Sequence, residues 1–299
     1  MKKLLLFGAI VQVFTCMSGL PFQLAQITLL PISCDNPALD GSVQIFGSGG
    51  TEPYTFTFNG GNPAFAASNF ASFSFPSSVT SLQIIGVDSS IPKQKPITVS
   101  ANPLVSSLRS ISFFLVLRCN GIQITYDTDV SVPQSVQLEG PNFKETQPLS
   151  NFGSFPADPT AGLSIGHYKL TFTPKPIPGS PQCNKPIVFE FDITQSPLSI
   201  RAQNNAECSA RENQGSLTVI AQGGAPNFTY SISGPSGIQT QVPTPNRKAT
   251  FTGLANGVYT VTVTDSATGF FKPDVCTQTT QVTVNSRRCK RKVLGAVAC

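Results

Sequence analysis

The chain has 299 residues, of which 40% are hydrophobic and only 12% are charged, so it can bury sizeable cores and does not have the composition of a disordered protein. Its formal net charge of +5 is concentrated at the two ends, where seven of the 20 basic residues lie (Lys2, Lys3, Arg287, Arg288, Lys290, Arg291 and Lys292). Without these seven, acidic residues slightly outnumber basic ones. The composition therefore argues against a nucleic-acid-binding face, and we expect no nucleic-acid partner.

Residues 1–18 have the features of a secretory signal peptide. Two lysines precede the apolar run Leu4–Val11, and small residues at Cys16 and Ser18 favour cleavage before Gly19. Lipidation at Cys16 is an alternative that the sequence leaves open. The apolar run is shorter than the roughly 20 residues that a membrane span requires, so we expect no transmembrane span in the mature chain. This start predicts an extracellular or cell-surface location.

The rest of the chain divides into three units of about ninety residues, at 19–101, 102–196 and 197–286, followed by a basic and apolar tail at 287–299. Residues 41–58 of the first unit align without a gap with residues 215–232 of the third. In each segment a Gly-Gly pair separates two runs of alternating apolar residues. This pattern predicts two strands joined by a tight turn, as in a β-hairpin.

A second repeated segment lies at residues 253–265 and, ninety-one residues earlier, at residues 162–174. In the later copy Tyr259 and two valines alternate with threonines, which predicts a strand with one buried and one solvated face. A tyrosine that begins such a strand after a turn is typical of the tyrosine corner of immunoglobulin-like sandwiches. We therefore predict that Tyr168 and Tyr259 are structural corner residues. The first unit is degenerate, because Leu82 replaces the tyrosine and Gly86 interrupts the inward face.

Short strands with frequent turn signals, repeated in units of this length, are typical of β-sandwiches. Outside the signal peptide we find no amphipathic helical stretch. The predicted fold is therefore all-β, with three tandem immunoglobulin-like β-sandwich domains after the signal peptide. A Pro-Leu pair at each junction, 103–104 and 197–198, is expected to limit bending between the domains.

The cysteines indicate an oxidising compartment. Cys119 and Cys183 of the second unit occupy the same relative places as Cys208 and Cys276 of the third. We therefore predict two disulfides, Cys119–Cys183 and Cys208–Cys276, each within one unit. Buried free thiols are the alternative.

Three further cysteines have no matching partner. Cys34 occupies the same place as Cys208, but its unit has no second cysteine, so we expect a free thiol that is either buried or available for an intermolecular bridge. Cys289 and Cys299 lie in the tail, where they can pair with each other. No Cys-x-x-Cys motif or neighbouring histidine accompanies these residues, so the sequence predicts no metal site.

Three motifs together carry a resemblance to a known family. They are Cys-x6-Gly-Ser, Gly-Gly-x-Pro-x-Tyr/Phe and Gly-Leu-x-x-Gly-x-Tyr-x-Val-x-Val-x-Asp, and they resemble the SprB-type repeat of bacterial surface adhesins. The resemblance is good over residues 208–285, partial over 34–100 and weak over 119–196. It implies an immunoglobulin-like fold and an adhesive role at the cell surface or outside the cell, and it carries no catalytic residues. One departure is the long insertion between Asp265 and Cys276.

Few residues offer chemistry beyond this. The only histidine, His167, lies at the start of a half-exposed strand, and we expect it on the surface. The carboxylates of Asp127, Asp129 and Asp265 lack the spacing of a calcium loop. Aromatic residues near loops (Phe70, Phe73, Phe75, Phe270 and Phe271) are expected to pack beneath those loops rather than to stack on sugars. We therefore predict no catalytic residues, no cofactor and no bound metal.

These observations predict an exported, non-enzymatic protein that acts as an adhesive or structural surface component. Its partners are expected to be other surface proteins or extracellular polysaccharide. The alternative is an accessory or glycan-binding region of a larger secreted enzyme.

Overall fold

A computed structural model describes residues 22–34, 40–59, 64–66, 69–90, 96–102, 104–128, 133–148, 150, 152–158, 160–205, 208–209, 215–266, 274–285 and 287–288. Several predictions concern residues outside these ranges: the signal peptide at 1–18, Asp129, Phe270, Phe271, Cys289 and Cys299.

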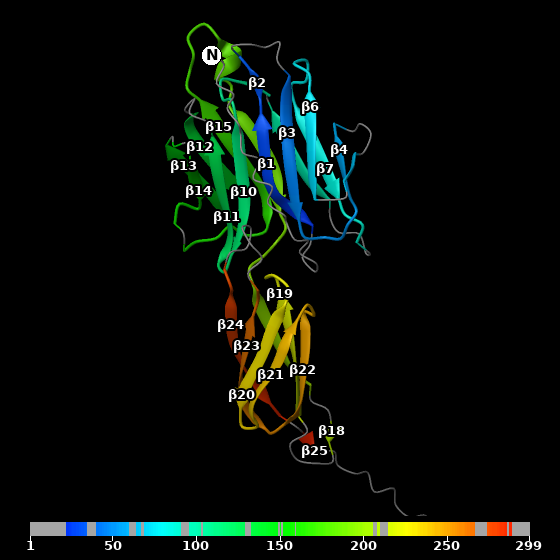
Figure 1. The fold of residues 1–299 in the computed structure, drawn as a ribbon. Coiled ribbons are helices and arrows are strands. Elements are labelled where there is room, and N and C mark those ends of the chain that lie inside the picture. The colour runs from blue at the N-terminus through cyan, green and yellow to red at the C-terminus, as the bar shows by residue number, and fades with distance from the viewer. Residues whose placement is uncertain are drawn as a thin grey trace, which may run out of the picture.

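The described residues form strands and one short 3-10 helix, η1 (Pro181–Asn184), so the predicted all-β fold of sandwich type is confirmed. Figure 1 shows a wide body built from the first two units and, below it, a narrower body built from the third unit. In both bodies the strands alternate buried and solvated residues, which is the pattern of two sheets that pack face to face.

The wide body consists of two sheets and a short parallel pair. The six-stranded sheet contains, in spatial order, β14 (Phe152–Phe155), β11 (Gly121–Thr128), β10 (Ile111–Arg118), β1 (Gln23–Leu30), β3 (Gly41–Ser48) and β6 (Phe70–Phe75). The eight-stranded sheet contains β13 (Phe143–Pro148), β12 (Pro133–Gly140), β15 (Gly166–Pro174), β16 (Ile187–Ile193), β8 (Ile97–Asn102), β7 (Leu82–Val87), β4 (Tyr54–Phe58) and β5 (Ala64–Ala66). The short pair is β2 (Ile32–Ser33) with β9 (Val105–Ser106).

Both large sheets run continuously through the first two units. In the six-stranded sheet β1 pairs with β10, so that Ile27 lies opposite Phe113, and in the eight-stranded sheet β16 pairs with β8. We call these two pairings the seam. Beside the seam the two sheets pack on each other, and the Phe113 ring lies 5.3 Å from the Phe189 ring and 5.0 Å from the Phe191 ring. The units at 19–101 and 102–196 therefore lie side by side around one hydrophobic core, and the expected boundary between them falls inside β8.

The third unit has its own core and a different pair of sheets. Its three-stranded sheet contains β17 (Ser199–Asn205), β19 (Gly215–Gln222) and β22 (Lys248–Leu254). Its four-stranded sheet contains β21 (Gly237–Thr244), β20 (Phe228–Gly234), β23 (Gly257–Thr264) and β24 (Thr277–Val284). A short parallel pair joins β18 (Cys208–Ser209) to β25 (Arg287–Arg288), at the start of the predicted tail.

The predicted hairpins around the Gly-Gly pairs are wrong. The turn at Gly49-Gly50 leads from β3 in one sheet to β4 in the other, and the turn at Gly223-Gly224 leads in the same way from β19 to β20. All four glycines have φ between 61° and 74°, a conformation that favours glycine. The motif therefore specifies a crossing between sheets, which the alternation of apolar residues alone does not distinguish from a hairpin.

A buried aspartate holds each of these turns. Asp88 accepts a hydrogen bond from the Thr51 amide at 2.8 Å, and Asp265 accepts one from the Ala225 amide at 3.0 Å. Thr51 and Ala225 each directly follow the Gly-Gly pair, so the two contacts are equivalent. Asp265 also accepts a bond from the Cys276 amide at 2.7 Å. These carboxylates have a structural function.

The predicted disulfide pairing is also wrong. The structure joins Cys34 to Cys183, with Cα atoms 5.7 Å apart, and Cys119 to Cys276, with Cα atoms 5.3 Å apart. Cys34 is therefore not a free thiol. Because the first two units lie side by side, the end of β2 reaches η1, and the tip of the β10–β11 hairpin reaches the third unit. Cys208 lies in β18. Its predicted partner, Cys276, instead forms a disulfide with Cys119.

The junction between the two bodies has two covalent connections. One is the chain itself, in which Gln195 and Leu198 are buried and the Ser196 carbonyl accepts a bond from the Gly224 amide at 3.1 Å. The other is the Cys119–Cys276 disulfide. Next to it Arg118 and Asp274 form an ion pair of 3.1 Å, which contributes little by itself because both side chains are more than a third exposed.

The two predicted corner tyrosines have the expected hydrogen bonds. The Tyr168 hydroxyl donates to the Ser164 carbonyl at 2.9 Å, and the Tyr259 hydroxyl donates to the Ala255 carbonyl at 3.1 Å. In both cases the acceptor lies four residues upstream, as a tyrosine corner requires. Tyr259 also lies 2.8 Å from the Ser236 hydroxyl.

The corner of the third unit can be tested by removing one oxygen atom. We expect Tyr259→Phe to lower the free energy of unfolding of the third unit by about 1–2 kcal/mol, because the buried hydrogen bonds of the phenol are lost while the ring stays packed. Urea denaturation measures this change. Thr262→Val, on the solvated face of the same strand, is the control and should change it by less than about 0.5 kcal/mol. Equal effects of the two substitutions would contradict the corner.

Candidate functional site: a polar groove across the eight-stranded sheet

The residues that the sequence offered for chemistry are dispersed. His167 lies on the solvated face of β15, where its Nδ1 atom is 3.0 Å from a carboxylate oxygen of Asp192. Asp127 is exposed on β11, and Asp265 holds the turn described above. Among the described residues, no group of three or more histidine, cysteine, aspartate and glutamate side chains is placed to hold a metal ion.

Of the loop-proximal phenylalanines, the structure describes Phe70, Phe73 and Phe75, which all lie in β6. Phe75 is buried, the Phe70 ring lies 4.5 Å from the Phe46 ring, and the Phe73 ring lies 5.4 Å from the Phe58 ring. Phe75 is thus part of the core, whereas Phe70 and Phe73 are half-buried and each packs against one neighbouring ring.

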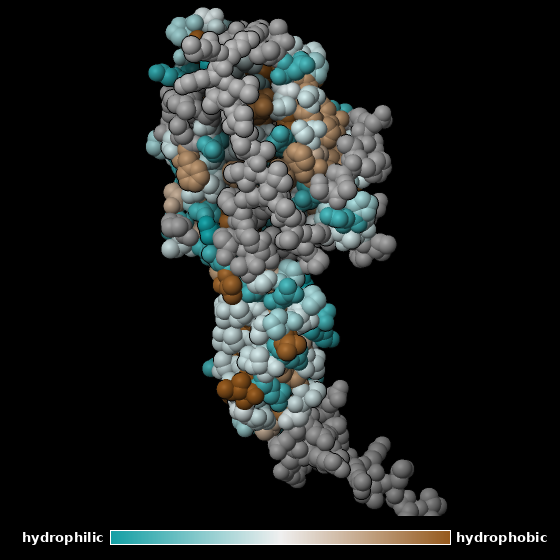
Figure 2. Space-filling view, viewed as in Figure 1, coloured by the Kyte–Doolittle hydropathy of each residue, from teal (hydrophilic) through white to brown (hydrophobic). Residues whose placement is uncertain are grey.

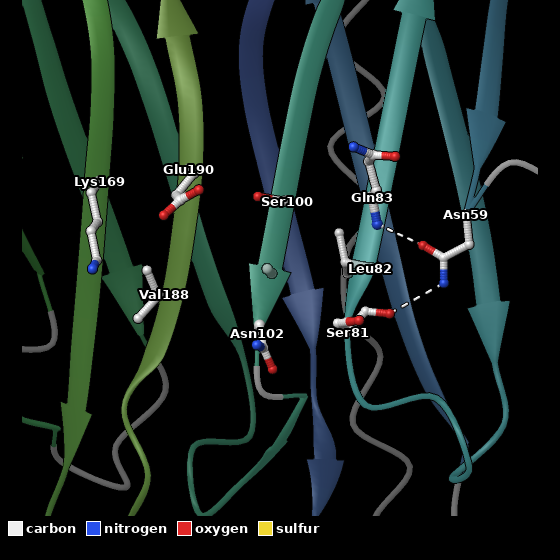
Figure 3. A pocket seen from close by; sticks show the side chains of 10 residues that line it. Asn59, Ser81, Leu82, Gln83, Ser100, Asn102, Lys169, Val188 and Glu190 are labelled. Carbon is white, nitrogen blue, oxygen red and sulfur yellow. Dashed lines mark hydrogen bonds between the residues drawn. The ribbon is translucent and has the colours of Figure 1, made fainter.

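The polar groups gather in a shallow groove on the solvated face of the eight-stranded sheet (Figure 3). Its volume is about 510 Å³. The lining residues come from β15, β16, β8 and β7 and from the ends of β4 and β7: Lys169, Val188, Glu190, Ser100, Ala101, Asn102, Ser81, Leu82, Gln83 and Asn59. The groove therefore crosses the seam and is built from both of the first two units.

The strand register aligns the polar side chains in a row at right angles to the strands. Lys169 lies opposite Glu190, Glu190 lies opposite Ser100, and Ser100 lies opposite Gln83. All four are on the solvated face, because their neighbours along each strand point into the core. We call Lys169, Glu190, Ser100 and Gln83 the polar row.

Asn59 ends the polar row and is held in place by the backbone. Its side-chain oxygen accepts a hydrogen bond from the Gln83 amide at 2.6 Å, and its side-chain nitrogen donates to the Ser81 carbonyl at 3.2 Å (Figure 3). Its φ of 46° lies in the left-handed region, which asparagine tolerates better than most residues. These contacts fix one wall of the groove.

The three-stranded sheet of the third unit has a second polar groove, but its groups bond to each other. The Asn205 side chain donates to the Thr218 hydroxyl at 2.8 Å, and the Thr218 hydroxyl lies 3.4 Å from that of Thr250. The groove on the eight-stranded sheet is therefore the better candidate for binding.

Sequence reasoning missed the polar row because no motif marks it. Each member is an ordinary outward residue of an alternating strand, and the row exists only after the strands are placed in register. The alternation of Lys169 with buried Tyr168 and Leu170 indicates which way one side chain points. It does not indicate which residues lie beside it.

Comparison with known proteins supports the resemblance for part of the chain. The family model of the SprB repeat matches residues 203–237, in the third unit. Comparison with curated protein sequences finds no match.

Two solved structures can be compared with this fold. One is described as "Ca2+-stabilized adhesin helps an Antarctic bacterium reach out and bind ice"; it is 11% identical, with 91% of this chain and 75% of that chain covered and a TM-score of 0.24. The other is described as "Central Fibronectin-III array of RIM-binding protein"; it is 12% identical, with 91% and 100% covered and a TM-score of 0.23.

No helix within the described part of the chain has the length and apolar character needed to cross a membrane.

The wall of the groove can be tested with two asparagines. Asn59→Ala should lower the free energy of unfolding of the wide body by about 1–2 kcal/mol, because it removes two hydrogen bonds and places alanine in a left-handed conformation. Asn102→Ala is the matched control, since its side chain has no hydrogen-bond partner among the described residues, and it should have an effect below about 0.5 kcal/mol. Chemical denaturation measures the free energy of unfolding of both variants. If Asn59→Ala is as stable as Asn102→Ala, Asn59 does not fix the wall of the groove.

Proposed function

We propose that this protein is an exported, non-catalytic component of an extracellular surface, with an adhesive or structural function. Its wide body presents polar faces to the surroundings, and its third unit is a repeat fixed firmly to that body. The observation that carries the proposal is the pair of disulfides that lock the units together. Such bonds form and persist in oxidising compartments outside the cytoplasm.

The two disulfide loops are interleaved. Cys34–Cys183 joins residues separated by 149 positions, and Cys119–Cys276 joins residues separated by 157. Each loop contains one cysteine of the other bond, so that reduction of one bond leaves most of the chain between Cys34 and Cys276 still enclosed by the other. A protein built in this way keeps its chain from being drawn out under tension, which suits a surface component that carries load.

The junction between the bodies also fits this function. A chain connection alone lets two domains bend and rotate relative to each other. Here the disulfide at Cys119 and the buried segment around Gln195 fix the third unit at two places. The third unit is thereby held at a defined distance and orientation from the polar groove.

The surface composition supports an extracellular setting without a strongly charged partner. Figure 2 shows separate brown side chains among pale and teal ones on the third unit. The exposed large apolar residues there include Ile238, Val242 and Val258. Together with the SprB repeat at 203–237, this mixed surface supports adhesion as the function.

Fractionation of the producing cells tests the proposal. The protein should be found in the extracellular or cell-surface fraction, and it should migrate faster on a non-reducing gel than on a reducing gel, because the closed loops keep the denatured chain compact. Protein that is found in the cytoplasm with all thiols reduced would overturn the proposal.

A further inference from the structure

We propose that the groove on the eight-stranded sheet binds a neutral polysaccharide, whose chain lies along the polar row and crosses the strands from β15 to β4. The inference rests on the proposed function in that the ligand is an extracellular polymer. It names the ligand class and the site, which the proposed function leaves open.

The groove offers hydrogen-bonding groups that the protein itself does not use. Among the described residues, the Lys169 ammonium, the Glu190 carboxylate and the Ser100 hydroxyl have no side-chain hydrogen bond or ion pair. The side-chain amides of Gln83 and Asn102 have no hydrogen bond within that part of the chain either. Donors and acceptors thus follow one another along the polar row, as recognition of a series of hydroxyl groups requires.

The charges of the groove favour a neutral ligand. Lys169 and Glu190 lie opposite each other in the register, yet they form no ion pair. Glu139 lies opposite Lys169 on its other side, but it pairs instead with Lys144, with 3.6 Å between the charged atoms. The groove therefore contains one available positive and one available negative charge. An anionic polymer would meet repulsion at Glu190 and a cationic one at Lys169.

The position of the groove within the sheet argues against a peptide strand as the ligand. An extended peptide adds to a sheet through main-chain hydrogen bonds at a free edge. The strands that form the groove already pair with neighbours on both sides, in the order β15-β16-β8-β7-β4. Only side chains are left for binding. A polyhydroxyl ligand needs no main-chain partner, and the half-buried Val188 side chain can contact the apolar face of a sugar ring.

The groove is also preorganised. Its residues lie on strands that share one continuous sheet, and Asn59 is fixed by two hydrogen bonds. Because the backbone of the groove and Asn59 are fixed before the ligand binds, the entropic cost of binding is limited to the ordering of the exposed side chains. The volume of about 510 Å³ falls within the range of about 300–1,000 Å³ of small-ligand sites, and it suits a few sugar rings of a longer chain.

Affinity gel electrophoresis and calorimetry on the full mature chain test the proposal. The neutral probes are dextran, laminarin, glucomannan and xyloglucan, and the anionic probe is alginate. At least one neutral probe should bind, and alginate should not bind at the groove. The variants Glu190→Ala and Lys169→Ala should each weaken this binding about tenfold or more, because each removes a charge-assisted hydrogen bond to the ligand. The variants Asp127→Ala and Lys185→Ala, at exposed positions outside the groove lining, are charge-matched controls and should leave the affinity unchanged.

Both groove residues are exposed, so their variants should keep the melting temperature of the unchanged protein, and this is measured alongside. The proposal is overturned if none of the neutral probes binds, if binding survives both groove variants, or if alginate binds in place of the neutral probes. These results test the groove alone. The proposed function is tested separately, by the cellular location and the redox state of the protein.

Discussion

The seam between the first two units is the constraint on which the rest of the structure depends. Pairing of β1 with β10 and of β16 with β8 joins what would be two sandwiches into one, and it removes four strand edges that would otherwise need protection. The seam also places Cys34 beside Cys183 and brings Glu190 next to Ser100. One disulfide and the candidate binding site therefore have the same origin.

The second disulfide extends this arrangement to the third unit. Loop closure over 157 residues stabilises the folded state by about 5 kcal/mol in the loop-entropy model. Its position at the junction matters more for function, because the tip of the β10–β11 hairpin is fixed to the neighbouring unit. The proposed function rests on this arrangement, in which a rigid body with a polar groove is fixed to a unit that the SprB repeat model matches at residues 203–237.

The local structure could be predicted from the sequence, because it depends on neighbours along the chain. Alternation of Tyr259, Val261 and Val263 with threonines indicates the strand, and the preceding turn indicates the corner. The interruption at Gly86 has a physical reason that only the fold reveals, since a Cβ atom there would lie 2.7 Å from Ile97 and 3.0 Å from Phe56. The disulfides and the polar row depend on which strands lie side by side. Equal cysteine spacing in the second and third units favours pairing within each unit only if the units are separate. The seam brings Cys34 to Cys183, and the tip of the β10–β11 hairpin brings Cys119 to Cys276.

The pairing of Cys34 tests the seam most directly, because this disulfide joins the first unit to the second. The measurement is mass spectrometry of a proteolytic digest of the non-reduced protein, with free thiols alkylated beforehand. We expect one linked peptide pair that contains Cys34 and Cys183 and another that contains Cys119 and Cys276. A linked pair of Cys119 with Cys183, together with an alkylated Cys34, would contradict the seam and would favour separate tandem domains.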